Sequence, residues 1–157
     1  MAAVDNTPAN GEQTFPYRSL NTDKAEIRLL TLATGKFDDS IEVTLRTWSL
    51  DEELYFEALS YDWGSEKSPT PIHICDYPHV ISSNLEIALR HLRSNEVPRV
   101  LWIDALCINQ QDLDEKANQV QLTNRIYSSA KTVLIWLGPK DDTSDTVMSI
   151  MLNQGKN

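Results

Sequence analysis

Polar residues that could bind a ligand follow three apolar segments of the sequence. The pairs are YFEALSY with Asp62-Trp63-Gly64, VLWI with Asp104, and TVLIWL with Gly138-Pro139-Lys140-Asp141-Asp142. Asp104 could orient a polar ligand, and Trp63 could stack on it. Asn109 and Gln110 could donate hydrogen bonds to a sugar or amide group. Alternatively, these side chains cap helices and tie turns, or plug a sheet edge in the case of the tryptophan, and both interpretations stay open.

Other kinds of chemistry have weaker support in the sequence. A nucleophilic Cys107 would need a neighbouring base or a helix N-terminus to lower its pKa, and the three histidines stand in no motif relation to it, so we expect a buried structural thiol. Asp62, Asp104 and Asp142 could hold Mg²⁺, yet they lack DxD spacing. The five glycines form no GxGxxG, GxxxxGK[ST] or GxSxG motif, which excludes the common dinucleotide, P-loop and serine-hydrolase signatures.

The N-terminal half predicts antiparallel strands that would stand beside these residues. Two β-like runs, 27–32 and 41–48, flank a turn at Gly35, and the second alternates apolar and polar residues, which predicts a hairpin with one wet face. Residues 55–61 form a further strand, and residues 73–81 contain a short hairpin. A helix then starts at Ser82-Ser83-Asn84, with Ser83 and Glu86 spaced as a capping box. Its apolar face is Leu85, Ala88, Leu89 and Leu92.

The second half predicts a parallel sheet. The runs 100–103 and 132–137 are continuously apolar, which is typical of central strands that are covered on both faces. Residues 112–130 between them predict a helix, and residues 143–152 a last one. The residues of the first of these helices that we expect to face the sheet are Leu113, Ala117, Val120, Ile126 and Tyr127. The alternation of strands and helices indicates an α/β fold, in which ligands bind at the carboxyl ends of the strands.

Composition and charge narrow the functional class. The chain has 157 residues, 41% of them hydrophobic, and a net charge of −9. Residues 38–67 hold nine acidic residues against two basic ones, and this balance disfavours binding to nucleic acids and to anionic membranes. No apolar run spans a bilayer, no signal peptide is visible, and Cys75 and Cys107 match no CxxC spacing, so we expect a cytoplasmic protein with reduced thiols. Residues 1–19 predict a loose tail, and residues 20–157 the domain.

Three long segments resemble the fungal heterokaryon incompatibility (HET) domain. They are FEALSYDWG (56–64), LWIDALCINQQDLDEKANQV (101–120) and IYSSAKTVLIWLG (126–138). Thr123 stands where the family usually has methionine, and Phe56 replaces a usual tyrosine. The resemblance implies a role in the cell death that follows fusion of genetically different fungal cells, through self-association or protein partners. It also implies a distant relationship to TIR domains, and so a flavodoxin-like open sheet with central parallel strands and, here, an N-terminal antiparallel hairpin.

The resemblance also implies a set of site residues. Those that would shape the crevice and its helix caps are Ser60, Tyr61, Asp62, Trp63, Gly64, Trp102, Asp104, Cys107, Asn109, Gln110, Asp112, Glu115, Gln119 and Tyr127. Some TIR domains cleave NAD⁺ with a glutamate that follows the third parallel strand. An enzyme of that type would use Asp104, Asp142 or Asp145 here, with NAD⁺ as substrate and with no cofactor or metal. A third hypothesis is a truncated remnant without signalling activity, because family members usually continue beyond this length.

Overall fold

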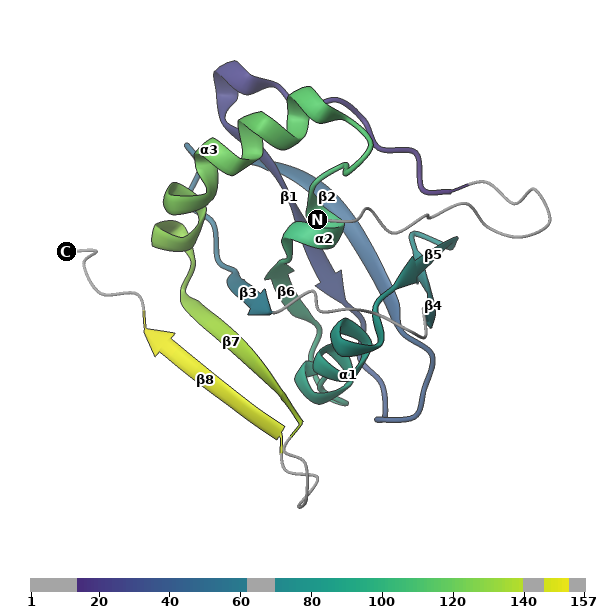
Figure 1. Ribbon diagram of the computed structural model, residues 1–157. Helices are drawn as coiled ribbons and strands as arrows, with labels where there is room; N and C mark the ends of the chain where they lie inside the picture. Colours follow the sequence, from purple (N-terminus) through teal and green to yellow (C-terminus); the bar gives the residue numbers. More distant parts are fainter. Residues whose placement is uncertain (1–13, 62–69, 140–145, 153–157) are drawn as a thin grey trace.

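The computed structural model describes residues 14–61, 70–139 and 146–152, and these form a mixed α/β fold (Figure 1). The strands are β1 (Glu26–Leu32), β2 (Glu42–Ser49), β3 (Glu57–Tyr61), β4 (Thr70–Ile74), β5 (Tyr77–Ile81), β6 (Arg99–Trp102), β7 (Thr132–Pro139) and β8 (Thr146–Leu152). The helices are α1 (Ser83–Leu92), α2 (Asp104–Cys107) and α3 (Leu113–Ser129), preceded by a 3₁₀ turn, Thr22–Lys24. Over the described residues the strands form one sheet in the order β5-β4-β2-β1-β6-β3-β7-β8.

The middle of the sheet is parallel, as the sequence predicted. β3 pairs in parallel with β6 on one side and with β7 on the other. The predicted hairpin of β1 and β2 is antiparallel, and β1 also pairs antiparallel with β6. In β2, Val43 and Leu45 are buried whereas Thr44 and Arg46 are exposed, which confirms the wet face.

The predicted second hairpin is confirmed as β4 and β5. Its two turn residues, Cys75 and Asp76, both have positive φ angles of 48° and 70°. A two-residue hairpin turn of this kind matches the right-handed twist of the strands, and it extends the sheet to its β5 edge.

The first predicted helix is present, but its cap lies one residue earlier than predicted. The Ser82 hydroxyl accepts a hydrogen bond from the Leu85 amide at 3.1 Å, so Ser82 and not Ser83 is the N-cap of α1. The predicted apolar face is buried in full. The capping box fails because Ser83 already lies in the first turn of the helix.

The predicted burial of α3 is wrong at three of five positions. Ile126 is buried and Tyr127 half-buried, but Leu113, Ala117 and Val120 are exposed. The inward positions belong instead to Glu115, which pairs with an arginine of β1, and to Gln119, which bonds the β1 backbone. The periodicity of the sequence predicted that the apolar residues of the helix face the sheet. In the structure Glu115 and Gln119 face it instead, because β1 offers them polar partners.

The predicted last helix is a strand. Residues Thr146–Leu152 form β8, which pairs antiparallel with β7, and residues 143–145 lie outside the described part. Thr146, Val147 and Ile150 are β-branched, and the edge of β7 offers them hydrogen-bonding partners, so the local preference and the sheet agree.

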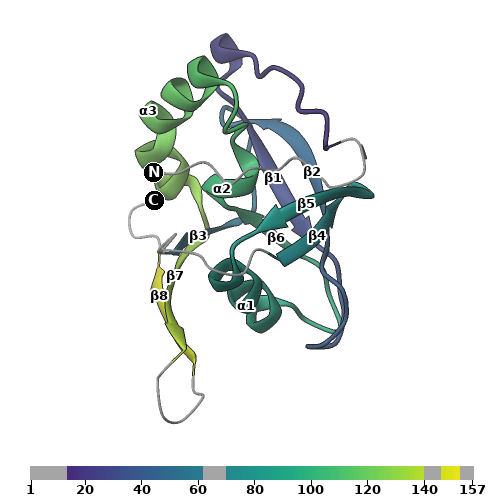
Figure 2. The same ribbon diagram turned by 45° about the vertical axis from the view of Figure 1, so that its right-hand side comes forward.

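Helices lie on both faces of the parallel part of the sheet. Trp102 of β6 is in register with Ala58, and Trp136 of β7 is in register with Tyr61, so the two indoles belong to opposite faces. Trp102 meets Tyr127 of α3, whereas Trp136 donates to Asn84 of α1 at 2.9 Å. The two views in Figures 1 and 2 show α1 and α3 well apart.

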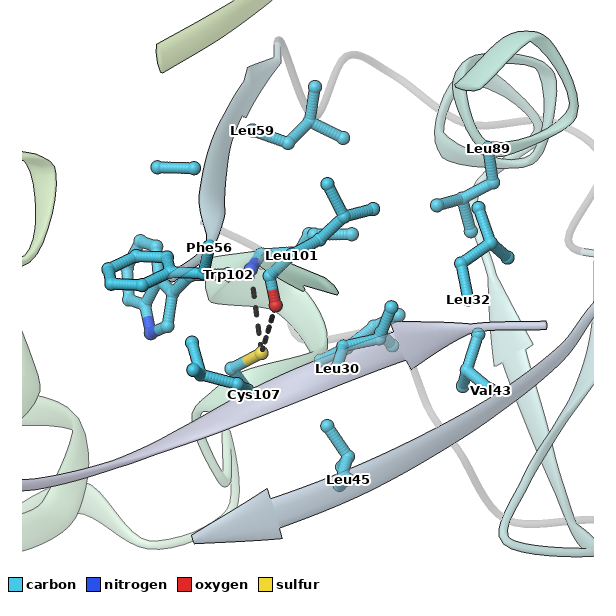
Figure 3. Close-up of a cluster of buried hydrophobic side chains, with 14 of the residues drawn as sticks. Leu30, Leu32, Val43, Leu45, Phe56, Leu59, Leu89, Leu101, Trp102 and Cys107 are labelled. Carbon is cyan, nitrogen blue, oxygen red and sulfur yellow. Dashed lines mark hydrogen bonds between the residues drawn. The ribbon is translucent and has the colours of Figure 1, made fainter. Parts of the chain in front are cut away.

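The core lies between α1, α2 and the sheet. Figure 3 shows Leu30 and Leu32 of β1, Leu59 of β3 and Leu101 of β6 together with Leu89 of α1. These side chains are fully buried and come from elements far apart in the sequence. The core thereby holds α1 and α2 against the strands that carry the candidate site.

The segment before β1 contacts the domain from residue 15 on. Residues 1–19 were expected to be loose, yet Phe15 and Tyr17 pack against the core, and the Tyr17 hydroxyl donates to the Leu106 carbonyl at 2.7 Å. Residues 1–13 lie outside the described part. The aromatic pair orders this segment because it buries apolar surface that its Pro- and Asn-rich neighbours lack.

Candidate functional site

The structure describes eleven of the sixteen predicted site residues, and four of these lie at the carboxyl ends of β3 and β6. Ser60 and Tyr61 end β3, Trp102 ends β6, and Asp104 opens α2. The predicted residues that lie outside the described part are Asp62, Trp63, Gly64, Asp142 and Asp145. The site residues that the structure describes therefore lie near the ends of β3 and β6, and those that follow β7 lie outside the described part.

Two tyrosines and one carboxylate come together at these strand ends. Burial raises the pKa of the Tyr61 and Tyr127 phenols, and the negative charge of Asp104 raises both further. Tyr127 hydrogen-bonds the Ser60 side chain, which favours the charged phenolate but does not reverse the shift. Both phenols are therefore protonated at neutral pH, so they are able to donate hydrogen bonds beside a carboxylate.

The indole of Trp102 forms the floor under Tyr127. The two rings meet edge to face, with centroids 5.8 Å apart and planes at 82°. Trp102 is buried, as Figure 3 shows for its position beside Phe56. This aromatic pair fixes the end of α3 against β6 and so fixes where Tyr127 presents its hydroxyl.

Cys107 is a structural thiol, as expected. It is fully buried, its Sγ accepts from the Ile103 amide at 3.4 Å, and it faces the Leu101 carbonyl at 4.0 Å (Figure 3). Burial raises the pKa of the thiol to about 12. A thiol with such a pKa carries almost no thiolate at neutral pH and is a poor nucleophile.

The amide side chains between α2 and α3 bind backbone. The side-chain amide of Gln110 donates to the backbone carbonyl of Asp104 at 2.9 Å. The side-chain oxygen of Asn109 accepts from the backbone amide of Gln111 at 3.1 Å. Asp112 is the N-cap of α3 and accepts from the Glu115 amide at 3.1 Å. For these three residues the structure supports the turn-tying and capping interpretation.

Glu115 is half of a buried ion pair. Its carboxylate accepts two hydrogen bonds from Arg28 of β1, at 2.7 and 2.9 Å, and one from the backbone amide of Asn109 at 2.5 Å. Arg28 also donates to the carbonyls of Cys107 and Arg18. The guanidinium thus joins β1, the end of α2, the start of α3 and the N-terminal segment at one point.

Two residues of this network, Arg28 and Tyr17, were missed from the sequence. The guanidinium of Arg28 lies 4.8 Å from the centre of the Tyr17 ring, a cation–π contact. A signal for Arg28 was present: with period-two alternation in IRLLTL, it shares the inward face of Leu30 and Leu32. A charge at an inward position predicts a buried partner.

Gln119 lies one turn after Glu115 on the same inward face of α3. Its side-chain amide donates to the Glu26 carbonyl at 3.0 Å. Glu115 and Gln119 therefore attach α3 to β1 through polar contacts at an i, i+4 spacing.

The chain matches known proteins along most of its length. Residues 56–156 match the family model described as "Heterokaryon incompatibility protein (HET)". Over 169 aligned residues, the chain is 33% identical to "Heterokaryon incompatibility protein 6, OR allele" of Neurospora crassa; the match covers 99% of the chain. The chain spans about a quarter of the length of that relative. No solved structure matches.

Within residues 14–61, 70–139 and 146–152, no helix combines the length and the apolar character that crossing a bilayer requires.

Proposed function

The chain belongs to the heterokaryon incompatibility (HET) family, and we propose that it is a cytoplasmic signalling module of fungal non-self recognition. In this proposal the module promotes programmed cell death when it associates with itself or with a protein partner. The relative in Neurospora crassa, named for heterokaryon incompatibility, supports the assignment to that process.

One observation favours a binding module over an enzyme. The segment 101–120 is the longest of the three that resemble the family, and three of its polar side chains are used inside the fold. Asp112 caps α3, Gln110 holds the α2 backbone, and Glu115 is neutralised by Arg28. Side chains that are bonded within the fold in this way stabilise the conformation of the domain. Recognition by a protein partner requires such a stable surface.

A distant relationship to TIR domains is part of the proposal. Three parallel strands, β6, β3 and β7, lie in a row with helices on both faces, which supports a doubly wound arrangement. The strands β1, β2, β4 and β5, which form two antiparallel hairpins joined by a parallel β2–β4 pairing, would then be additions on one side of this unit.

The proposal is tested by expression in a fungal host. Induced expression of the wild-type chain should slow growth, and Asp104→Ala and Trp63→Ala should relieve the effect. Asp51→Ala, at an exposed position, is the matched control and should keep it. Immunoblots must show equal abundance of the four proteins. Normal growth with abundant wild-type protein would contradict the proposal and favour the non-signalling remnant.

A second candidate function is cleavage of NAD⁺, and the position of Asp104 favours it. Its carboxylate lies at the carboxyl end of β6, close enough to two protonated phenols to raise the pKa of both. A carboxylate there could stabilise the positive charge that develops on the ribose when water replaces nicotinamide. Purified protein at high concentration should then release nicotinamide from NAD⁺, and Asp104→Asn should abolish the release. Absence of turnover in the assembled protein would retire this candidate.

A further inference from the structure

The outer face of α3 carries an apolar stripe. Leu113 and Val120 are 77% and 61% exposed, and Ala117 between them is exposed as well. Their i, i+4, i+7 spacing places them on one side of the helix, and we call these three residues the α3 stripe. Because apolar side chains on a helix normally face the core, two large ones that face outward mark a surface that can be covered.

The α3 stripe cannot turn inward. The opposite side of the helix is held by the Arg28–Glu115 ion pair, the bond from Gln119 to the Glu26 carbonyl and the buried Ile126. Rotation of α3 would leave a buried guanidinium without its carboxylate, at a cost far above the gain from covering two aliphatic side chains. In Figures 1 and 2 α3 lies at the periphery of the described part of the fold.

The charges beside the stripe are complementary to those of a second, antiparallel copy of the helix. Asp114 and Arg125 are eleven residues apart, which is about three turns or ~16 Å, and so both lie along the same flank of α3. When two α3 helices pack antiparallel with Val120 near the two-fold axis, Asp114 of each copy lies opposite Arg125 of the other. Ala117 is small enough to let the two helices approach closely.

We propose that a second copy of this chain docks on the α3 stripe, in a two-fold antiparallel pairing of α3 helices. The inference rests on the proposed function, because it names the surface through which the module associates with itself. The net charge of −9 makes two copies repel each other over most of their surface. The flank of the stripe holds Asp114 and Arg125, so this face carries both signs and attracts its own copy.

Arg125 can serve this contact while it keeps its partner within the chain. It donates from Nη2 to Asp51 at 2.7 Å, and the pair is solvent-exposed. A guanidinium has five N–H donors, which leaves several for a second carboxylate. A single helix buries less surface than the ~800 Å² per partner of a stable complex, so we expect a transient dimer.

Sedimentation velocity on the purified chain, from about 10 µM to 1 mM, covers the range in which a small interface associates. The wild type should shift from monomer to dimer with concentration. Val120→Asp should weaken the dimer about tenfold or more. Val97→Asp is the matched control, because Val97 is an equally exposed valine in the connection between α1 and β6. Circular dichroism must show that both variants are folded.

Charge exchange tests the orientation of the two helices. Asp114→Arg and Arg125→Asp should each weaken the dimer, and the double variant should restore it. Asp51→Asn removes the negative charge that faces Arg125 within the chain and should leave the dimer intact. A monomeric wild type, or single variants that dimerise like wild type, would overturn the inference.

The two proposals fail separately. Growth arrest by a wild-type chain that stays monomeric in solution contradicts the α3 dimer and leaves the signalling function standing. A dimer that the single charge reversals weaken and the double variant restores, in a chain that does not affect growth, supports the α3 interface and contradicts the signalling function.

Discussion

Arg28 and Glu115 form a bidentate ion pair that joins β1 to the first turn of α3. The two Nη···Oε distances are 2.7 and 2.9 Å, and the side chains are only 3% and 6% exposed. Glu115 lies inside the longest segment that resembles the family, whereas Arg28 lies in the preceding hairpin. The ion pair therefore makes the family segment depend on a strand that precedes the matched residues 56–156.

Removing one partner of this pair should destabilise the fold strongly. Arg28→Ala or Glu115→Ala leaves an unpaired buried charge, and we expect each to lower the free energy of unfolding by about 3–5 kcal/mol. Urea denaturation followed by circular dichroism measures this. Arg125→Ala, at the exposed pair with Asp51, is the control and should cost about 1 kcal/mol or less. A double variant, Arg28→Met with Glu115→Leu, should lose less than the sum of the single losses.

The two cysteines should differ sharply in reactivity. Cys107 is fully buried and burial raises its pKa to about 12, whereas Cys75 is half-buried at the turn between β4 and β5. In Cys75→Ser protein, an aromatic disulfide reagent at pH 8 should react with Cys107 only when the protein unfolds. In Cys107→Ala protein, Cys75 should react in the native state. Rapid native labelling of Cys107 would contradict the buried position.

Stability should fall in mild acid because of His79. Burial lowers the pKa of this imidazole from 6.5 to about 4, so between these values the unfolded chain binds a proton that the folded chain does not. Stability is then fully present above pH 6.5 and is lost as the pH falls toward 4, by up to about 3 kcal/mol. Unfolding curves at pH 7 and pH 5 measure the change. His79→Leu should flatten the dependence over this window, and an unchanged slope in that variant would assign the loss to other groups.

The N-cap of α3 should be sensitive to the loss of its side-chain acceptor. Asp112→Ala removes the acceptor for the Glu115 amide and should cost about 1 kcal/mol. Asp112→Asn keeps an acceptor at the same place and should cost only a few tenths of that. Thermal unfolding of the two variants distinguishes the hydrogen-bonded cap from an effect of the carboxylate charge. Equal losses in both would show that the carboxylate charge, and not the cap, is what matters.

Much of the fold was visible in local patterns. The alternation in 41–48 predicted β2 with its wet face, and the apolar runs at 100–103 and 132–137 predicted parallel strands with a neighbour on each side. The face of α1 followed from its spacing. These patterns work because a strand or helix with one apolar side has a single way to bury it.

The candidate site was predictable only in part. That polar residues gather after β3 and β6 followed from the parallel topology, and the structure brings Ser60, Tyr61, Asp104 and Tyr127 together. The roles of Asn109, Gln110 and Asp112 were open, because one amide or carboxylate suits a ligand and a backbone group equally well. The hydrogen-bond partners of these side chains decide which role each one has, and the partners are known only from the folded structure.

The order of residues along the chain sufficed to identify the family, the α/β class and the position of nearly every strand, since all of these depend on neighbours in sequence and on short periods. Three features needed the assembled fold: the sheet edge that makes 146–152 a strand, the inward rotation of Glu115 and Gln119, and the exposed α3 stripe. Each is decided by contacts between distant segments. A buried Arg28 outweighs the apolar pattern of a helix, because an unpaired charge in the interior costs more than two exposed aliphatic side chains.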